Sequence, residues 1–318
     1  MQKQIPLLVV AGPTASGKTR LAIDLARRYG GEVVSADSMQ IYQGMAIGTA
    51  QPTREEMGEI PHHLVGFLPP GERFSVADYV ELARKTIADI HRRDRLPILA
   101  GGTGLYISSL IDNVEFAETG SSLEIRERYR RLAEREGNAH VLECLRRVDP
   151  ETAEKLHPNN IGRVIRALEL YELTGMPMSR HKELSRRSPS PYRLFCLGLD
   201  YRERQTLYDR INLRVEKMVE AGLLEEAEQL FRSPYSATAA QAIGYKELLP
   251  YFQGDQPLDS CLELIRMQSR RYAKRQLTWF RRDERMHWYF PDDWESYAGM
   301  FENITRDIEK SGILCYTE

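Results

Sequence analysis

Three short segments combine glycine, hydroxyl, amine and carboxylate groups at spacings that could do chemistry. The first, GPTASGKT, matches the phosphate-binding loop GxxxxGK[ST] and lies between an apolar run and a helical pattern. Its residues are Gly12, Pro13, Thr14, Ala15, Ser16, Gly17, Lys18 and Thr19. Backbone amides and the N-terminus of the next helix hold a di- or triphosphate in such a loop. Lys18 would contact the terminal phosphate and Thr19 could bind Mg²⁺, so the segment predicts a phosphate site but names no reaction.

The second segment, DSMQIY, follows the second predicted strand, at the edge where parallel sheets bind ligands. Asp37 could act there as a general base or orient a nucleophile. Ser38 and Gln40 add hydrogen-bonding groups suited to the edge of a nucleobase. The alternative is that Asp37 only caps the following turn, a role worth about 1 kcal/mol.

The third segment, GGTGLY, repeats the strand-to-helix arrangement at a neighbouring strand. It could bring Thr103 to the same crevice, or it could be no more than a tight turn. We find no other strand ending in an acidic residue that would orient water in an ATPase, and no loop set typical of protein kinases. The phosphate loop is therefore interpreted as serving a diphosphate leaving group.

The elements that must position these segments follow the pattern of an α/β protein. Continuous apolar runs predict buried strands, and apolar residues three or four apart predict helices. We predict strands at residues 5–11, 32–36, 63–67, 97–100, 193–199 and 286–290, and helices at 17–29, 76–93, from 105 onward, 203–221, 223–231, 240–249 and 258–282. Because strands alternate with helices, we expect a parallel sheet flanked by helices, like that of P-loop NTPases.

A different pattern occupies the middle of the chain. Residues 121–185 show only helical periodicity, and a loop rich in proline and serine follows at 186–191. We therefore predict an all-helical insertion domain at 116–191. Residues 1–115 and 192–318 would form the α/β core with a helical C-terminal part. A typical size of about 150 residues per domain agrees with two domains.

The composition is that of a globular protein, with 42% hydrophobic residues, 28% charged residues and a net charge of −2. The apolar runs are too short for a membrane span, and the N-terminus does not resemble a signal peptide. The four cysteines lie far apart, so we expect reduced thiols in a cytoplasmic protein. They are Cys144, Cys196, Cys261 and Cys315. We also expect a monomer.

The segment Leu264–Arg285 is strongly basic, with eight Arg and Lys residues against two acidic ones. In a helix the basic residues would fall on two adjacent faces, Arg270, Lys274 and Arg281 on one and Arg271, Arg275 and Arg282 on the other. Such a surface either binds nucleic-acid phosphates or is a solvated face balanced by acidic helices elsewhere. We expect Trp279 and Phe280 to lie in the core.

Seven motifs occur together and in this order: GPTASGKT at 12–19, DSMQIY at 37–42, IGTAQPT at 47–53, GGTGLY at 101–106, GRVIRALE at 162–169, QAIGYKE at 241–247 and YAKRQLTWFRR at 272–282. In combination they resemble the bacterial tRNA dimethylallyltransferase (tRNA isopentenyltransferase) family over nearly the whole chain. The resemblance implies transfer of the dimethylallyl group of dimethylallyl diphosphate to N6 of the adenine 3′-adjacent to the anticodon in tRNA. The chain departs from the family at Gln43 and Gln51, where relatives often carry basic residues.

The resemblance also implies roles for individual residues. The phosphate loop and Arg214 would bind the donor's diphosphate, and Lys18 with Mg²⁺ would stabilise it as it leaves. Asp37 would be the general base, and Thr103 would lie in the catalytic crevice. The anticodon stem-loop would contact Asp37, Ser38, Met39, Gln40, Thr103, Arg126, Gly162, Arg163, Arg166, Gln241, Gly244 and Lys246.

Other classes of function remain open on the residues alone. A P-loop small-molecule or nucleoside kinase would use Lys18 for ATP and Asp37 as a base toward a hydroxyl. A non-catalytic RNA-binding protein would need only the basic segment. A prenyltransferase acting on free adenine nucleotides is a closer variant, but a small acceptor needs neither the helical insertion nor the basic helix.

Overall fold

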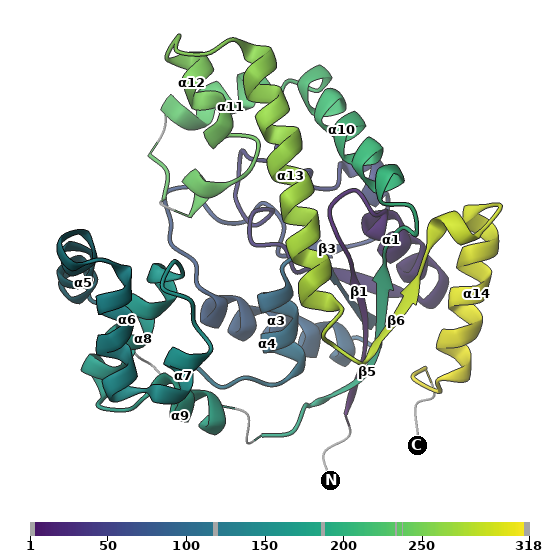
Figure 1. Ribbon diagram of the computed structural model, residues 1–318. Helices are drawn as coiled ribbons and strands as arrows, with labels where there is room; N and C mark the ends of the chain where they lie inside the picture. The colour runs from purple at the N-terminus through teal and green to yellow at the C-terminus, as the bar shows by residue number, and fades with distance from the viewer. Residues whose placement is uncertain (1–3, 117–119, 186–187, 233, 237, 315–318) are drawn as a thin grey trace. The chain divides into compact units, whose positions relative to one another are not determined.

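The structure is a computed structural model that describes the chain except residues 1–3, 117–119, 186–187, 233, 237 and 315–318 (Figure 1). The chain divides into two compact units. The described parts of Met1–Ile111 and Pro191–Glu318 form the larger unit, and those of Asp112–Ser190 form the smaller one. The chain thus leaves the larger unit after Ile111 and rejoins it at Pro191.

The larger unit is built on a parallel sheet with the strand order β3-β2-β4-β1-β5-β6. The strands are β1 (Ile5–Ala11), β2 (Gly31–Ser35), β3 (His62–His63), β4 (Leu96–Gly101), β5 (Tyr192–Leu199) and β6 (Met286–Tyr289). From Pro6 to Ala11 every residue of β1 is buried, which explains its continuous apolar run. The prediction of a parallel sheet flanked by helices is confirmed.

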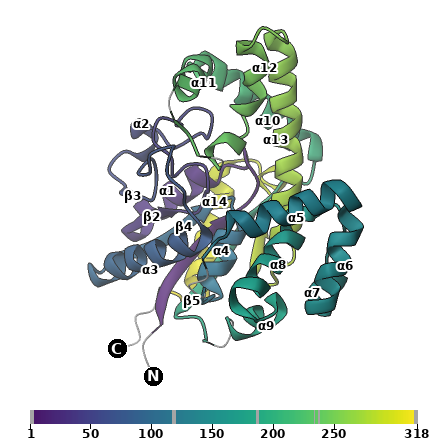
Figure 2. The same cartoon turned by 90° about the vertical axis from the view of Figure 1, so that its left-hand side faces the viewer.

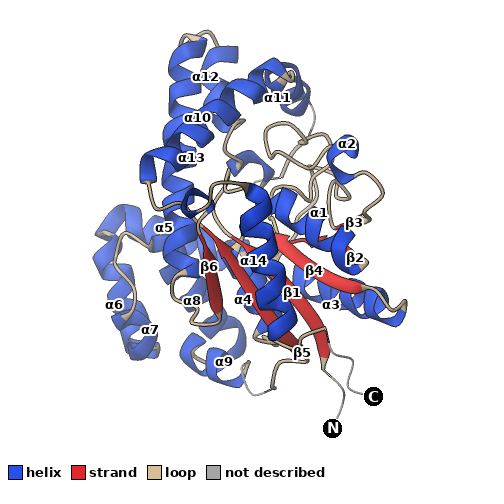
Figure 3. Ribbon diagram, turned by 90° about the vertical axis from the view of Figure 1, so that its right-hand side faces the viewer, coloured by secondary structure: helices blue, strands red, loops and turns tan. Residues whose placement is uncertain are grey.

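Helices cover both faces of this sheet. They are α1 (Lys18–Tyr29), α2 (Arg54–Met57), α3 (Val76–Arg92), α4 (Gly104–Ile111), α10 (Arg204–Glu220), α11 (Leu223–Arg232), α12 (Leu249–Phe252), α13 (Leu258–Phe280) and α14 (Tyr297–Lys310). Leu25 of α1 and Ile304 of α14 pack on the face that includes Val10, with α14 in front of the strands in Figure 3. On the opposite face, α3 and α4 pack against residues such as Val9.

A third apolar core joins the helical C-terminal part to the segment after β2. Tyr42 and Met45 of that segment pack with Leu230 of α11, with Ile265 of α13 and with Tyr245, which lies between α11 and α12. In Figures 1 and 2, α10, α11 and α12 gather around one end of α13, and the other end of α13 reaches α4. This core anchors the helices that complete the candidate site.

Three local predictions were wrong. The strand predicted at 63–67 ends at His63, because Leu64 turns away with φ of 62°. The helix predicted at 240–249 is replaced by two 3₁₀ turns, Ala239–Gln241 and Lys246–Leu248, because Gly244 has φ of 104°, which no α-helix accommodates. Phe280 is buried as expected, whereas Trp279 is 39% exposed.

The smaller unit contains only helices among its described residues, as the periodicity predicts. They are α5 (Leu123–Glu136), α6 (Asn138–Val148), α7 (Pro150–Glu154), α8 (Ile161–Thr174) and α9 (Met178–Leu184). Its own core includes Val141 and Leu145 of α6 and Val164 and Leu168 of α8. The unit therefore has an independent apolar interior.

Two further expectations concern the whole chain. Within the described residues, no helix combines the length and the apolar character needed to cross a membrane. Cys144, Cys196 and Cys261 form no disulfide, whereas Cys315 lies outside the described residues.

Candidate active site

The sheet order brings the first three chemical segments together. Since β2, β4 and β1 are neighbours, the segments that follow them meet at one edge. Thr103 N–H donates to the Ala36 carbonyl (3.0 Å), and Thr103 Oγ1 accepts from Ser38 N–H (2.9 Å). A Cβ at Gly101 would lie 2.2 Å from the same Ala36 oxygen, so this close approach requires glycine. Thr103 therefore contacts the segment that carries Asp37.

The phosphate loop has the geometry that its sequence predicts. Gly12 and Gly17 have positive φ values of 151° and 95°, and Gly17 begins α1. The first turn of α1 contains no acidic residue, which leaves its positive N-terminus available to an anion. Lys18 Nζ donates to the Pro13 carbonyl at 2.9 Å.

Two cations lie close enough to affect one another. Burial and, to a smaller extent, the charge of Arg214 lower the pKa of Lys18 to about 8, while the charge of Asp37 opposes both. Burial also lowers the pKa of Arg214, with Asp37 and Glu56 acting in the opposite direction. Repulsion between two neighbouring cations is relieved when an anion binds between them. The pair is therefore suited to a phosphate group.

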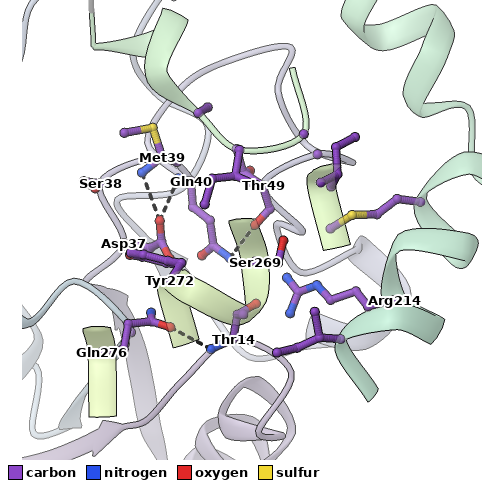
Figure 4. A pocket seen from close by; sticks show the side chains of 18 of the residues that line it. Thr14, Asp37, Ser38, Met39, Gln40, Thr49, Arg214, Ser269, Tyr272 and Gln276 are labelled. Atoms are coloured by element: carbon purple, nitrogen blue, oxygen red, sulfur yellow. Dashed lines mark hydrogen bonds between the residues drawn. The ribbon is translucent and has the colours of Figure 1, made fainter. Parts of the chain in front are cut away.

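These groups line a cavity of about 260 Å³, which we call the main cavity because it contains Asp37 as well as Lys18 (Figure 4). Of the predicted site residues it is lined by Thr14, Lys18, Thr19, Asp37, Ser38, Met39, Gln40, Arg214, Gln241, Gly244 and Lys246. Figure 4 shows Arg214 pointing into the pocket from one side, with Asp37 and Tyr272 on the other. The structure thus gathers residues from segments far apart in the chain.

A second cavity, of about 710 Å³, adjoins the phosphate loop from another direction. It shares Lys18, Thr19, Arg214 and Met218 with the main cavity, so the lysine faces both. Its other charged lining residues are Arg20, Glu56, Arg210 and Lys217. Ala15 and Gly17 also line the second cavity, whereas Gly12, Pro13, Ser16 and Thr103 line neither.

Of the two roles that the sequence left open for Asp37, the hydrogen bonds show the capping one. Its Oδ1 accepts hydrogen bonds from the backbone N–H groups of Met39 (2.9 Å) and Gln40 (3.4 Å), which is a capping arrangement. Within the described chain its other oxygen makes no hydrogen bond. The Gln40 amide instead donates to the Ala50 carbonyl (2.8 Å) and accepts from the Ser35 hydroxyl, so it fixes the loop.

Sequence reasoning missed the part of the main cavity that α13 supplies. Ser269, Tyr272, Arg275 and Gln276 all line it. Burial raises the pKa of the Tyr272 hydroxyl, and the Asp37 charge raises it further, so the tyrosine stays protonated. The signal was present, because positions 269, 272 and 276 fall on one helical face, but the adjacent positive charges dominated the interpretation.

The four predicted contacts in the smaller unit fall into two pairs. Arg126 (2.9 Å) and Arg166 (2.6 Å) both bind Glu169, which is fully buried. Burial alone would raise the pKa of Glu169, but hydrogen bonds from Arg166, a backbone amide and Arg126 leave it below its ordinary value. These arginines therefore neutralise a buried carboxylate, whereas Gly162 and Arg163 are exposed in the first turn of α8.

Half of the basic residues of Leu264–Arg285 are already paired. Arg266 and Arg270 contact Glu263, Arg281 contacts Asp200, and Arg285 contacts Asp283. Four exposed cations make no ion pair within the described chain: Arg271, Lys274, Arg275 and Arg282. Three of these four belong to the same predicted helical face, which retains its positive charge.

Asp200 is a second acidic residue at the end of a strand, but its contacts do not leave it free to orient water. It directly follows β5 and is fully buried. Its carboxylate accepts a hydrogen bond from Arg281 (2.7 Å) and one from the Tyr201 N–H (2.8 Å). These contacts neutralise the carboxylate within the protein, at the C-terminal end of α13.

The parallel sheet, the phosphate loop and the adjoining carboxylate define an α/β protein of the phosphate-loop class. The family model described as IPP transferase matches residues 40–283, and the one described as isopentenyl transferase matches residues 5–63. The chain belongs to the IPP transferase family, whose curated members include the tRNA dimethylallyltransferases.

Individual relatives support this assignment. The chain is 48% identical to the tRNA dimethylallyltransferase of Caldanaerobacter subterraneus subsp. tengcongensis, covering 94% of this chain and 96% of that one. Among solved structures, the tRNA isopentenylpyrophosphate transferase of Bacillus halodurans aligns with a TM-score of 0.72, 42% identity and coverage of 99% and 97%. A eukaryotic dimethylallyltransferase described as acting on tRNA gives 0.78, with 28% identity and coverage of 96% and 79%.

Proposed function

We propose that this protein transfers the dimethylallyl group of dimethylallyl diphosphate to N6 of the adenine 3′-adjacent to the anticodon in tRNA. The products are N6-isopentenyladenosine and diphosphate. One observation carries the proposal: the Lys18–Arg214 cation pair and the Asp37 carboxylate line the same cavity. The names of the relatives indicate the substrates, and the charges of the cavity suit a diphosphate and a proton-donating amine.

The donor's diphosphate binds at the phosphate loop, between Lys18 and Arg214. Its charge relieves the repulsion between these two cations. The second cavity, lined by Arg20, Arg210 and Lys217, offers an anionic donor a route to the same lysine. The diphosphate then leaves with the electrons of the C1–O bond, and the two cations stabilise that charge.

The acceptor is a purine flipped out of the anticodon loop into the main cavity. Its N6 forms the new bond to C1 of the donor, and Asp37 accepts the proton that N6 loses. This amine is a poor nucleophile because its lone pair is delocalised into the ring. A general base that accepts its proton typically raises the rate by about 10²–10⁴-fold. Thr103 holds the Ser38 amide next to Asp37 and so supports the base.

Mg²⁺ is the metal that we propose. No group of three or more His, Cys, Asp or Glu side chains suited to a metal occurs among the described residues, so diphosphate oxygens would supply most of its ligands. Thr19 lines both cavities, and its hydroxyl is the protein ligand that we propose to join the diphosphate oxygens. Such an ion would neutralise charge on the leaving group.

The tRNA contacts remain those expected from the sequence. Ser38, Met39, Gln40, Gln241, Gly244 and Lys246 would surround the flipped base. We further propose that residues 116–191 form a tRNA-contacting domain, in which the exposed Arg163 is better placed to bind phosphate than the paired Arg126 and Arg166. We also propose a cytoplasmic monomer, which gel filtration of the purified protein would test.

The decisive experiment is mass spectrometry of nucleosides from unmodified tRNA incubated with the protein, dimethylallyl diphosphate and Mg²⁺. We expect N6-isopentenyladenosine at the position 3′ of the anticodon. Parallel reactions with AMP as acceptor, and with γ-labelled ATP in place of the prenyl donor, test the nucleotide prenyltransferase and the kinase. Product only in either of those two reactions would contradict the proposal.

A further inference from the structure

One buried side-chain amide joins the two halves of the proposed reaction. Gln276 of α13 is only 5% exposed. Its Oε1 accepts a hydrogen bond from the Thr14 N–H (2.9 Å), and its Nε2 donates one to the Gly102 carbonyl (3.0 Å). The first of these bonds is drawn in Figure 4. The amide thus spans two loops that are far from α13 in the sequence.

The two loops carry different chemical groups. Thr14 belongs to the phosphate loop, four residues before Lys18. Gly102 immediately precedes Thr103, whose hydroxyl holds the Ser38 amide beside Asp37. Because the Thr14 N–H is bound to Gln276, this backbone donor is not directed at a phosphate. The Gln276 amide therefore connects the phosphate loop to the segment that contains Thr103.

The fit around this amide is tight. A Cβ at Gly102 would lie 2.1 Å from Gln276 Nε2, so glycine is needed for the amide to reach the carbonyl. The sheet itself does not depend on this contact, since β1 and β4 pair directly, with Ala11 opposite Gly101. Gln276 acts beyond the ends of these strands, where no ladder hydrogen bond holds the two loops.

We propose that Gln276 is a positioning residue that fixes the distance between the diphosphate bound at Lys18 and the Asp37–Thr103 pair. The proposal rests on the proposed function. It predicts that losing the amide leaves donor binding largely intact but misplaces the reacting carbon relative to the base. A misplacement of about 1 Å can lower turnover roughly 100-fold.

The test compares Q276M, which keeps the bulk but loses both hydrogen bonds, with wild type and with Q253M, an exposed glutamine at the end of α12. Calorimetric titration with inorganic pyrophosphate measures the affinity of the phosphate loop for diphosphate. Steady-state prenylation of tRNA measures kcat and KM. We expect pyrophosphate affinity within about threefold of wild type. We also expect kcat to fall roughly 10- to 100-fold, with less change in the donor KM.

A second variant reaches the same contact from the opposite loop. G102A leaves α13 unchanged but places a methyl group against Nε2, so it should reproduce the kcat defect. In a Q276A background the added methyl group has room, and G102A should then cause little further loss. This non-additivity distinguishes the loss of one shared contact from two independent defects. If Q276M does not fold, the kcat of G102A alone tests the positioning role.

Each outcome bears on a stated claim. Wild-type kcat in folded Q276M or G102A would overturn the positioning role while leaving the proposed function intact. Defects that multiply in the double variant, or a loss confined to pyrophosphate affinity, would also overturn it. Failure of the wild-type protein to make N6-isopentenyladenosine would instead overturn the proposed function, and the positioning role with it.

Discussion

At the scale of single residues, the two carboxylate oxygens of Asp37 differ in their contacts. Oδ1 caps the turn through Met39, and within the described chain Oδ2 makes no hydrogen bond. Asparagine retains the capping oxygen but cannot accept a proton at neutral pH. The substitution D37N therefore separates the two roles better than alanine, which would remove both.

We expect D37N to retain tRNA binding and to lose about 10²–10⁴-fold in kcat, the usual contribution of a general base. Filter binding measures the first quantity and single-turnover prenylation the second. D255N, at an exposed aspartate after α12, is the matched control and should behave as wild type. Equal turnover of D37N and wild type would assign Asp37 to capping alone.

Lys18 provides a pH-dependent prediction. Burial and the charge of Arg214 lower its pKa to about 8, and a bound diphosphate raises that pKa again. Proton uptake therefore accompanies binding, and affinity should fall as the pH rises through about 8, where the free protein loses the lysine proton. At pH 8 the lysine should take up roughly half a proton, because it is half ionised when its pKa equals the pH.

Calorimetry with inorganic pyrophosphate in two buffers of different ionisation enthalpy measures this uptake. K18R is the control, because arginine stays protonated across this range and the titration of pyrophosphate itself cancels in the comparison. Identical proton uptake by K18R and wild type would show that Lys18 does not titrate on binding.

At the scale of elements, what the sequence predicts depends on how local the signal is. The phosphate loop, Asp37 and Thr103 were predictable because each follows a strand, and parallel strands gather such segments at one edge. Gln276 was not, because only tertiary packing brings α13 to those loops. Its partners, Thr14 and Gly102, are 262 and 174 residues away in the sequence.

The errors among the elements have similar physical causes. Apolar spacing predicted a helix at 240–249, but the positive φ of Gly244 interrupts it. The spacing of apolar residues does not reveal a positive φ. No helix was predicted for α14, although Met300, Ile304 and Ile308 recur at helical spacing behind a Ser296 cap. This spacing and the serine cap are sufficient to predict the helix from the sequence.

Helix α11 illustrates an acidic residue that positions part of the site. The Glu226 carboxylate accepts hydrogen bonds from the backbone of Ile47 (3.0 Å) and Gly48 (2.9 Å) and from the Tyr245 hydroxyl (2.6 Å). A Cβ at Gly48 would meet the Tyr245 ring at 2.5 Å. Glu226 therefore holds together two segments that both contribute to the main cavity.

E226Q replaces an acceptor-only group by an amide whose donors would face other donors. We expect the free energy of unfolding to fall by about 1–3 kcal/mol, measured by urea denaturation, and the KM for tRNA to rise. E228Q on the same helix is the control, since among the described residues the Glu228 carboxylate pairs only with exposed Arg232, and its loss should cost less than about 1 kcal/mol. A similar effect of both substitutions would remove any special role for Glu226.

At the scale of the whole molecule, net charge is a poor guide to the partner. The chain carries −2 overall, yet Arg271, Lys274, Arg275 and Arg282 remain exposed and unpaired within the described residues of α13 and its C-terminal end. Arg275 also lines the main cavity. Since α13 presents both this charge and Gln276, the helix that would bind RNA phosphates also carries the amide at the catalytic loops.

Charge reversal at Arg271 and Arg275 tests whether this helix binds RNA. Each phosphate contact that is lost should reduce the slope of log affinity against log salt by roughly one unit. The tRNA KM should rise by a larger factor than the pyrophosphate affinity falls, because only Arg275 of the two lines the main cavity. Fluorescence anisotropy with tRNA at several salt concentrations measures the slope.

The control makes the same change in net charge at the opposite edge of the sheet. Arg27 and Arg92 lie in the last turns of α1 and α3, and helices between parallel strands end at the amino edge, away from the site. Reversal of Arg27 and Arg92 should leave the slope as in wild type. If both double variants lower it equally, the dependence reflects only overall charge, and α13 is a solvated basic face.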